Sequence, residues 1–402
     1  MEHFISLVGL IIFIGLAYLL SVNRSAIQWQ TIIWGVGLQF CLALFILKTP
    51  IGLAIFEWLG NSIKILLDFS DVGAKFVFGE SFEDHFFAFK VLPTIIFFAA
   101  LVTILYHYEI IPRVVSMLSS IMMHTMKTSG TESLSCAANI FVGSTEAPLI
   151  IKPYLKNLTL SELHAVMTGG FATIAGGVMA AYIAMGISPT HLISASVMSA
   201  PAALAISKIM YPETEKTQIS QEIVATIESP YINLIDAATN GALEGLKLAI
   251  NVAAMLIAFL GLVALVNALL STVGNLIGLS KLSLELIFSY LLAPAAWLMG
   301  VPWEDCLNVG ILLGKKTILN EFIAYLDLKT LIEQQTISPR SQIIATYALC
   351  GFSNLGAIGI AIGGISAIAP TRQQDLAKLG LRTMTAGTLA CFMTACIAGL
   401  LL

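Results

Sequence analysis

One uncharged stretch decides the class of this protein: residues 165–207 read AVMTGGFATIAGGVMAAYIAMGISPTHLISASVMSAPAALAIS. The stretch contains no Asp, Glu, Lys or Arg, and it is too long for a single membrane crossing, which takes about 20 residues. The sequence Gly-Ile-Ser-Pro-Thr interrupts it at 186–190, and glycine and proline are the strongest punctuators of helices. We therefore predict two membrane-spanning segments here.

The composition of the whole chain agrees with this prediction. Of its 402 residues, 57% are apolar and only 11% are charged, with 24 acidic and 20 basic side chains; the mean hydropathy is +0.90. An ordinary soluble domain has about a quarter charged residues, which cover its surface. The composition therefore excludes a water-soluble enzyme, a nucleic-acid-binding protein and a disordered chain. We predict an all-α polytopic protein in the lipid bilayer.

Seven further uncharged runs are candidate spans, which with the two at 165–207 makes nine candidates for about eight crossings; the run 286–303 is the weakest of them. These runs are residues 4–22, 25–47, 91–108, 248–280, 286–303, 341–371 and 383–402. The segment 58–84 mixes charged residues with aromatic ones, which is typical of helices that lie in the membrane interface. The polar segment 211–229 is expected in solvent.

The basic residues predict how the chain is oriented, because short cytoplasmic loops carry an excess of Lys and Arg. Arg24 lies between the first two predicted spans, and the loop before the last span contains Arg372, Lys378 and Arg382. Both loops are therefore expected in the cytoplasm. Both termini would then be periplasmic or extracellular, in a multi-pass protein of the inner (cytoplasmic) membrane.

Two polar segments stand between apolar ones, at what should be membrane depth. They read Asn139-Ile-Phe-Val-Gly-Ser-Thr-Glu-Ala-Pro148 and Thr317-Ile-Leu-Asn-Glu-Phe-Ile-Ala-Tyr325, and each predicts a re-entrant hairpin with a polar tip. An apolar helix interrupted by small residues follows each one, at 173–177 and 353–356. Such pairs in two halves of a chain indicate an inverted-repeat transport domain, because unwound backbone at that depth must line a cavity or be buried in protein.

Each predicted hairpin tip carries a glutamate, Glu146 in the first and Glu321 in the second. A carboxylate at membrane depth is costly unless it is paired or hydrated, so both are candidate functional residues. The alternative places both in headgroup water, but it does not explain why the same context occurs twice. Lys315 and Lys316 are interpreted as a snorkelling hairpin base.

The motifs that are missing narrow the function further. The sequence has no P-loop, so ATP is not the expected energy source, and it has no Ser/His/Asp or HExxH arrangement, so we expect no enzyme. Two alternatives to the main prediction stay open: a hairpin-type transporter of another small polar solute, and a channel. An anionic solute would favour arginine at the tips, where this sequence has glutamate. A channel would only equilibrate its solute, whereas a transporter concentrates it.

Specific motifs resemble those of the concentrative nucleoside transporters. The resemblance is carried by Gly143-Ser-Thr-Glu-Ala-Pro-Leu149, by Lys152-Pro-Tyr154 and by Asn320-Glu-Phe-Ile-Ala-Tyr325. Further matches at 196–201, 212–216 and 348–352 extend it, in order, over essentially the whole chain. It implies a bacterial cation-coupled symporter that imports nucleosides such as uridine, with no nucleic-acid partner. It also implies a homotrimer of eight-span protomers with two opposed hairpins and an elevator-type movement.

The resemblance also implies a division of the chain into four segments. Residues 1–110 would be N-terminal spans and interfacial helices of the scaffold, and residues 208–285 would add a polar loop and a long scaffold helix. The transport domain would comprise residues 111–207, with the first hairpin and broken helix, and residues 286–402, with the second hairpin, broken helix and last span.

The family's substrate-binding positions fall on both hairpins. The base would be recognised by Ser144, Thr145 and Glu146, with Val178 as an apolar wall, and the ribose by Glu321 and Asn354, with Phe352 nearby. The chemistry fits, because a nucleoside is neutral and its ribose hydroxyls can donate to a carboxylate and an amide. A buried site built for those hydroxyls rejects deoxy analogues.

The family's cation position corresponds to Asn139, the Val142 carbonyl, Thr173 and the Ile174 carbonyl. All of these are oxygen ligands, as a hard cation requires. Sodium is the expected coupling ion, and a proton is the alternative because some bacterial members use protons. Ion and substrate would share the first hairpin tip, so each would favour the binding of the other.

The sequence departs from the family pattern at two positions. Ser144 stands where relatives commonly carry Gln, so its shorter side chain would reach the base only through water. Ala357 stands where relatives carry a Ser that helps to bind ribose. The preference between purine and pyrimidine nucleosides and the affinity for ribose therefore do not follow from the resemblance.

Overall fold

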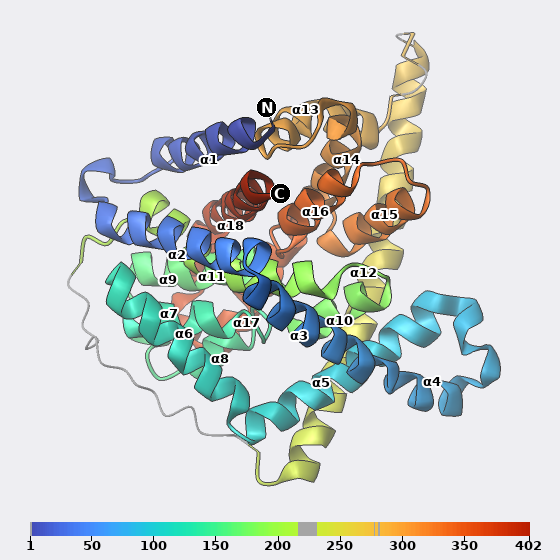
Figure 1. Ribbon diagram of the computed structural model, residues 1–402, viewed down its shortest axis with the longest axis horizontal. Helices are drawn as coiled ribbons and strands as arrows, with labels where there is room; N and C mark the ends of the chain where they lie inside the picture. The colour runs from blue at the N-terminus through green and yellow to red at the C-terminus, as the bar shows by residue number, and fades with distance from the viewer. Residues whose placement is uncertain (1, 216–230, 277, 280–281) are drawn as a thin grey trace.

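The structure is a computed structural model that describes residues 2–215, 231–276, 278–279 and 282–402 (Figure 1). All the regular elements of this part of the chain are helices, with no strand. The first half contains α1 (Glu2–Leu19), α2 (Trp29–Lys48), α3 (Pro50–Asp68), α4 (Ser70–Phe78), α5 (Leu92–His107), α6 (Ile110–Met126), α7 (Gly130–Ala138), α8 (Ala147–Ile150), α9 (Leu160–Ala172), α10 (Gly176–Ala184) and α11 (Pro189–Met210).

The second half begins with the longest helix described and ends with a mostly buried one. Its elements are α12 (Leu234–Leu276), α13 (Leu284–Leu298), α14 (Cys306–Ile318), α15 (Glu321–Glu333), α16 (Pro339–Leu349), α17 (Leu355–Ile368) and α18 (Gln373–Leu401). Short 3-10 helices and one π-helix (Phe86–Val91) connect some of these elements.

The described residues contain 8 helices that are long and apolar enough to cross a membrane, which agrees with the predicted number. The set differs from the predicted one. The expected span at 341–371 is divided into α16 and α17, because the backbone leaves the helix between Leu349 and Leu355, and the expected span at 286–303 is the 15-residue α13. Much of the segment 58–84, expected in the interface, instead belongs to Pro50–Phe78, which meets the length and composition of a span. Residues 216–229 of the predicted solvent segment, with Lys216 of the 212–216 match, lie outside the described residues.

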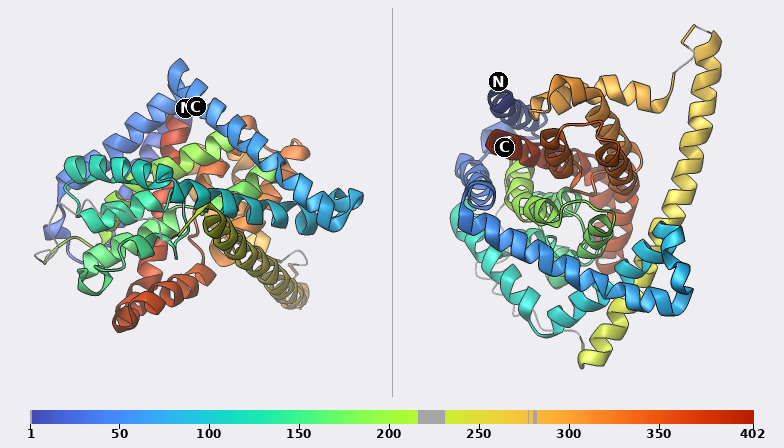
Figure 2. Two further views of the ribbon diagram at one scale, coloured as in Figure 1. Left: turned by 90° about the horizontal axis from the view of Figure 1, so that it is seen from below. Right: turned by 45° about the vertical axis from the view of Figure 1, so that its right-hand side comes forward.

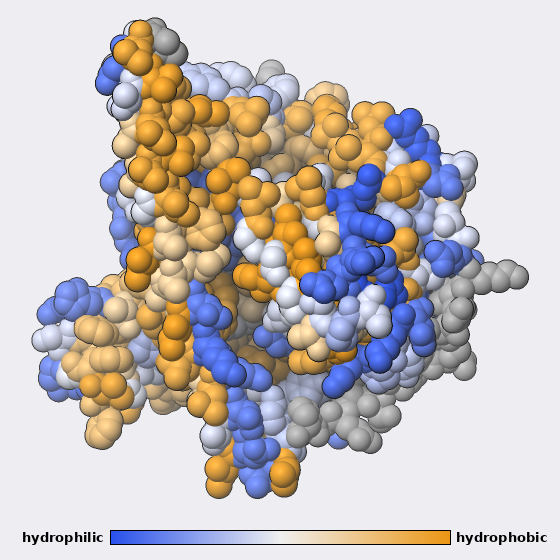
Figure 3. Space-filling view, turned by 180° about the vertical axis from the view of Figure 1, so that it is seen from behind, coloured by the Kyte–Doolittle hydropathy of each residue, from blue (hydrophilic) through white to orange (hydrophobic). Residues whose placement is uncertain are grey.

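Helix α12 is longer than the uncharged run 248–280 that predicted it. It begins at Leu234 and has 43 residues, or about 65 Å at 1.5 Å per residue, roughly twice the thickness of a bilayer core. The predicted start of the helix lies too far along the chain, because the first turns contain the charged residues Asp236, Glu244 and Lys247. Figures 1 and 2 show α12 at one edge of the molecule, where it packs along α5. Hydrophobic side chains cover much of its length on the face seen in Figure 3.

Two small residues bring α12 and α5 together. A side chain at Gly241 would collide with Thr103 and would meet the Ala99 carbonyl oxygen at 2.7 Å, and one at Gly245 would meet the Ile96 Cα at 2.7 Å. The spacing of four residues is the small-xxx-small pattern that lets membrane helices approach closely. Thr103 uses this proximity to donate a 2.8 Å hydrogen bond to the Ala237 carbonyl.

We expect Gly241→Ala to loosen this helix pair, because the added methyl group has no space. Overpacking of this kind costs about 1–3 kcal/mol, so the apparent melting temperature of the purified protein should fall. Gly261→Ala is the matched control, because a side chain there would meet nothing within 4 Å in the protomer. Equal melting temperatures for the two variants would contradict the close packing of α5 on α12.

Helices α9, α11 and α18 form the centre of the molecule and pack on one another. They are mostly buried, which explains why residues 165–207 carry no charge: nearly all of their side chains face protein. The predicted interruption at 186–190 is confirmed, because α10 ends at Ala184 and α11 begins at Pro189.

A buried ion pair ties the first hairpin to this centre. Glu132 on α7 and Lys208 on α11 are almost fully buried, and their charged atoms lie 2.6 Å apart. Glu132 also completes a capping box with Ser129 at the start of α7, which satisfies backbone donors that the helix leaves free. Helices α7 and α11 are therefore joined by both packing and charge.

Candidate functional site

Both predicted helix breaks are confirmed, and the two broken segments meet. Helix α9 ends at Ala172 and α10 begins at Gly176, while α16 ends at Leu349 and α17 begins at Leu355. The Phe352 backbone N–H donates to the Thr173 carbonyl at 3.1 Å, which links one break directly to the other. The Gly176 N–H donates to the Phe141 carbonyl at 3.2 Å, which adds the tip of the first hairpin. Backbone N–H and C=O groups that have no helical partner at the breaks therefore form hydrogen bonds with one another.

The second hairpin places Glu321 at this crossing. Helices α14 and α15 fold back on each other through Leu319 and Asn320, and the Asn320 side chain caps α15 by accepting from the Ile323 N–H. Glu321, the first residue of α15, is only 4% exposed. A carboxylate this deeply buried needs partners of its own.

Glu321 has a hydrogen-bond donor on each carboxylate oxygen. The Tyr182 hydroxyl donates to Oε1 at 2.9 Å, and Asn354 Nδ2 donates to Oε2 at 3.2 Å. Asn354 is itself fixed, because its Oδ1 accepts from the Ala357 N–H and so caps α17. The structure therefore brings the predicted ribose residues Glu321 and Asn354 into direct contact. The third, Phe352, is half-buried in the break and bonds to Thr173.

Sequence reasoning missed Tyr182, which is fully buried on α10. A signal was present, because Tyr182 follows the predicted wall residue Val178 by four positions and therefore lies on the same helix face. Val178 is also buried, at 3% exposure. The partner of Tyr182 lies 139 positions further along the chain, which no local pattern reveals.

The interpretation of Lys315 and Lys316 as a hairpin base was wrong. Both lie in the last turn of α14, next to the hairpin tip. Lys316 is 1% exposed and donates to the Ala348 carbonyl at 2.8 Å near the end of α16, where a cation is favoured by the helix dipole. It also interacts electrostatically with Glu321, so the buried carboxylate has a buried positive charge nearby.

The predicted cation residues gather around the first break. Asn139 is 1% exposed; its Nδ2 donates to the Ser135 carbonyl at 2.9 Å, and its Oδ1 is buried with no hydrogen-bond partner. Thr173 is also buried, and its hydroxyl donates to the Gly169 carbonyl at 2.9 Å, which leaves the oxygen free to accept. Ile174 is fully buried beside it, and Val142 is half-buried on the tip. An unpartnered buried amide oxygen suits an oxygen ligand for a hard cation.

The predicted base residues lie on the tip of the first hairpin, but they do not share one environment. Ser144 and Thr145 are half-buried. A side chain at Gly170 would meet the Ser144 Cβ at 2.7 Å and the Asn139 Oδ1 at 3.8 Å, so Ser144 packs close to the candidate cation residue. Thr145 packs against Gly364 on α17. Glu146 is exposed, and its charge interacts with that of Glu244 on α12.

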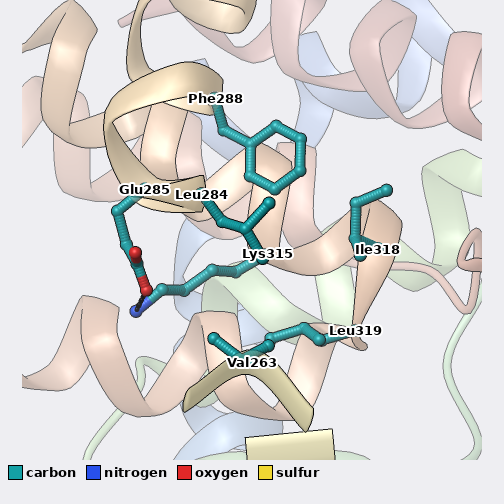
Figure 4. A pocket seen from close by; sticks show the side chains of 7 residues that line it. All are labelled: Val263, Leu284, Glu285, Phe288, Lys315, Ile318 and Leu319. Carbon is teal, nitrogen blue, oxygen red and sulfur yellow. Dashed lines mark ion pairs between the residues drawn. The ribbon is translucent and has the colours of Figure 1, made fainter. Parts of the chain in front are cut away.

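A cleft that none of these residues lines lies between α12, α13 and the end of α14. It is lined by Val263, Leu284, Glu285, Phe288, Lys315, Ile318 and Leu319. Figure 4 shows the Glu285 and Lys315 side chains meeting at its edge, with charged atoms 3.8 Å apart. Lys315 also pairs with Asp327 on α15 at 2.6 Å. The cleft contains none of the predicted binding residues.

Comparison with known families decides the identity. Residues 191–399 match the "Na+ dependent nucleoside transporter C-terminus", residues 8–81 match the corresponding N-terminus, and residues 88–189 match a "Nucleoside recognition" gate. The chain belongs to the sodium-dependent nucleoside transporter family. The predicted resemblance is thereby confirmed, and so is the expectation that the family is one of transporters and not of enzymes.

Individual members of the sodium-dependent nucleoside transporter family are similar along the whole chain. Solute carrier family 28 member 3 of Mus musculus is 47% identical over 414 residues, covering 100% of this chain and 59% of that protein. Sodium/nucleoside cotransporter 1 of Mus musculus is 45% identical, covering 100% of this chain and 64% of that protein. The chain thus spans about three-fifths of the length of these curated relatives.

Solved structures of one member agree with the fold. CNTnw in an inward-facing substrate-bound state matches with a TM-score of 0.94 and 38% identity, covering 100% of this chain and 98% of that chain. A CNTnw variant in an outward-facing state also matches with a TM-score of 0.94. The all-α, multi-pass membrane fold predicted from the sequence is therefore confirmed.

Proposed function

We propose that this protein is a symporter that imports nucleosides across the cytoplasmic membrane, coupled to a sodium gradient. The observation that carries the proposal is the buried Glu321 carboxylate, held from both sides where the two broken helices cross. A neutral, hydroxyl-rich solute suits such an acceptor. The family description names sodium and nucleosides, and it gives no support to the proton alternative.

The ribose would bind beside Glu321 and Asn354, with Phe352 as an apolar neighbour. Each carboxylate oxygen can accept two hydrogen bonds, and Tyr182 and Asn354 use one on each. The Glu321 backbone N–H also interacts with the carboxylate, and the acceptor capacity that remains is open to a ribose hydroxyl. An anionic solute would bring a second negative charge to this carboxylate, which argues against a dicarboxylate.

The sodium ion would bind to Asn139, Thr173 and the carbonyls of Val142 and Ile174. Support comes from the unpartnered Asn139 Oδ1 and from its position beside the first break. Asn139 and Ser144 both lie close to Gly170. An ion bound to Asn139 would therefore order the hairpin tip on which Ser144 lies. Binding of the ion would thus favour binding of the nucleoside, and the reverse follows by linkage.

The base would lie against Ser144, Thr145 and Glu146, with Val178 as the wall. We expect Ser144→Gln to change the preference between purine and pyrimidine nucleosides by about two- to tenfold, the value of one neutral hydrogen bond, because the longer amide reaches the base directly. Competition of unlabelled adenosine and cytidine against radiolabelled uridine measures this preference. Identical competition profiles for the variant and the wild type would remove Ser144 from the base site.

The transport cycle would be an elevator-type movement of the two hairpins and broken helices against a scaffold built on α12. Support comes from the long, mostly exposed α12, which packs chiefly on α5, and from the match to CNTnw in opposite states. The protein would be a homotrimer with re-entrant hairpins and both termini outside. These features follow from the resemblance and from the Arg24 and Arg372 loops.

Saturable uptake tests this function against the other candidates. In proteoliposomes with sodium outside, uridine uptake should saturate, and other nucleosides should inhibit it while an amino acid and a dicarboxylate do not. Uptake that rises linearly with concentration would indicate a channel. Inhibition by the dicarboxylate but not by nucleosides would indicate a transporter of another solute.

A further inference from the structure

Tyr182 has contacts that single it out among the buried residues around Glu321. It lies on α10, in the first half of the chain, and its hydroxyl donates to the Glu321 carboxylate in the second half at 2.9 Å. Its ring is fully buried, with its centroid 4.2 Å from that of Tyr325 and 5.6 Å from that of Phe322. Close packing on two aromatic rings holds the phenol in place, so its hydroxyl cannot turn away.

The orientation of the Glu321 carboxylate depends on its hydrogen bonds. The terminal torsion of a glutamate is broad and does not by itself fix the carboxylate plane. The side chains that set that plane are Tyr182, which donates to Oε1, and Asn354, which donates to Oε2; the Glu321 backbone N–H also interacts with the carboxylate. Asn354 is fixed by its role as the α17 cap, so among the side chains it is Tyr182 that limits rotation of the carboxylate about this anchor.

Because Ala357 has no hydroxyl group, the orientation of the Glu321 carboxylate matters more for binding the ribose. It contributes no hydroxyl to the crossing, and its N–H is already used by Asn354. Recognition of the two neighbouring ribose hydroxyls therefore falls on Glu321 and Asn354. A carboxylate accepts two neighbouring hydroxyls only if both oxygens face them at once, because hydrogen bonds weaken steeply away from linearity.

From these contacts we infer that Tyr182 is a positioning residue that sets the discrimination between ribonucleosides and deoxynucleosides. Its hydroxyl holds Glu321 Oε1 so that the free acceptor positions of both carboxylate oxygens face the ribose. This inference rests on the proposed function and deepens it. Tyr182 acts through Glu321 and does not itself contact the substrate.

The test compares two chemically identical changes at neighbouring buried tyrosines. Tyr182→Phe removes the donor to Glu321. Tyr325→Phe is the matched control, because Tyr325 is equally buried but donates to the Thr346 carbonyl at 2.8 Å. Both variants keep the aromatic ring, and size-exclusion chromatography with thermal melting checks that they fold. The uptake efficiency, Vmax/KM, is measured in proteoliposomes for uridine and for 2′,3′-dideoxyuridine, which lacks both hydroxyls.

For Tyr182→Phe, the efficiency with uridine should fall roughly tenfold to hundredfold, the range for one hydrogen bond to a charged group. The efficiency with dideoxyuridine should change little, so the ratio of the two efficiencies falls towards one. Tyr325→Phe should leave that ratio at the wild-type value. An unchanged ratio in Tyr182→Phe, with wild-type uptake intact, would overturn the inference and leave the proposed function standing. Failure of the wild type to transport uridine would overturn both.

Discussion

Replacing Glu321 with glutamine is expected to reduce nucleoside uptake by more than about a hundredfold. The carboxylate accepts from Tyr182 and Asn354, and both donors would face a side chain that offers only one oxygen. In the proposed complex two ribose hydroxyls also lose a charged acceptor. Hydrogen bonds to charged groups contribute about 1.5–3 kcal/mol each, so losing two of them accounts for the expected factor. Lys316 would also lose its anionic neighbour.

The loss should concern transport and not folding. Neutralising the carboxylate removes its own desolvation cost, which offsets part of the stability lost when the buried Lys316 is left without an anionic neighbour. Glu333→Gln is the matched control, since Glu333 ends the same helix, is 63% exposed in its side chain and pairs only with Lys329 at 3.6 Å among the described residues. Initial rates of uridine uptake are compared for both variants, and size-exclusion chromatography checks that both are folded. Normal uptake by Glu321→Gln would remove this residue from the ribose site.

Replacing Asn139 or Thr173 with alanine is expected to raise the sodium concentration for half-maximal uptake by at least about tenfold. That is the lower end of what even indirect support of a metal ligand contributes, and in the proposed site an oxygen ligand itself would be lost. Maximal uptake at saturating sodium should recover in part, because substrate and ion contacts are separate. Sodium titrations at constant ionic strength, with choline as the replacement, measure the shift.

Thr173→Ser provides the control for this prediction. Serine keeps the hydroxyl that donates to the Gly169 carbonyl and its ability to accept, so the sodium titration should stay close to that of the wild type. If both alanine variants showed the wild-type sodium dependence, the ion would bind elsewhere. By linkage, the alanine variants should also bind nucleoside more weakly at low sodium.

The hairpins and helix breaks could be predicted because their sequence signal is local. Asn139, Glu146 and Glu321 are polar residues among apolar ones, and a bilayer tolerates such residues only in special surroundings. The same reasoning located both breaks, which the structure confirms at Thr173 and at 350–354. The error was to count the interrupted run 341–371 as one span, because the break divides it into α16 with 11 residues and α17 with 14.

The partners of the site could not be predicted, because they depend on distant parts of the chain. Tyr182 and Lys316 occur in apolar and basic surroundings that give no hint of Glu321, and only the fold brings them to it. Glu146 shows a second kind of error, in which a local pattern suggests an environment that the fold does not provide. Its context matches that of Glu321, but the structure leaves it exposed near Glu244. Similar sequence contexts in the two hairpins therefore do not imply similar burial.

The most direct test of sodium-coupled nucleoside symport is the accumulation of radiolabelled uridine in proteoliposomes that contain the purified protein. An inward sodium gradient is compared with choline at constant pH, and an acid-outside gradient without sodium forms the third arm. Sodium-coupled symport predicts accumulation above equilibrium with the sodium gradient and in no other arm. Accumulation driven by the acid-outside gradient would contradict the sodium site at Asn139 and Thr173. No accumulation under either gradient, in a folded protein, would contradict nucleoside symport itself.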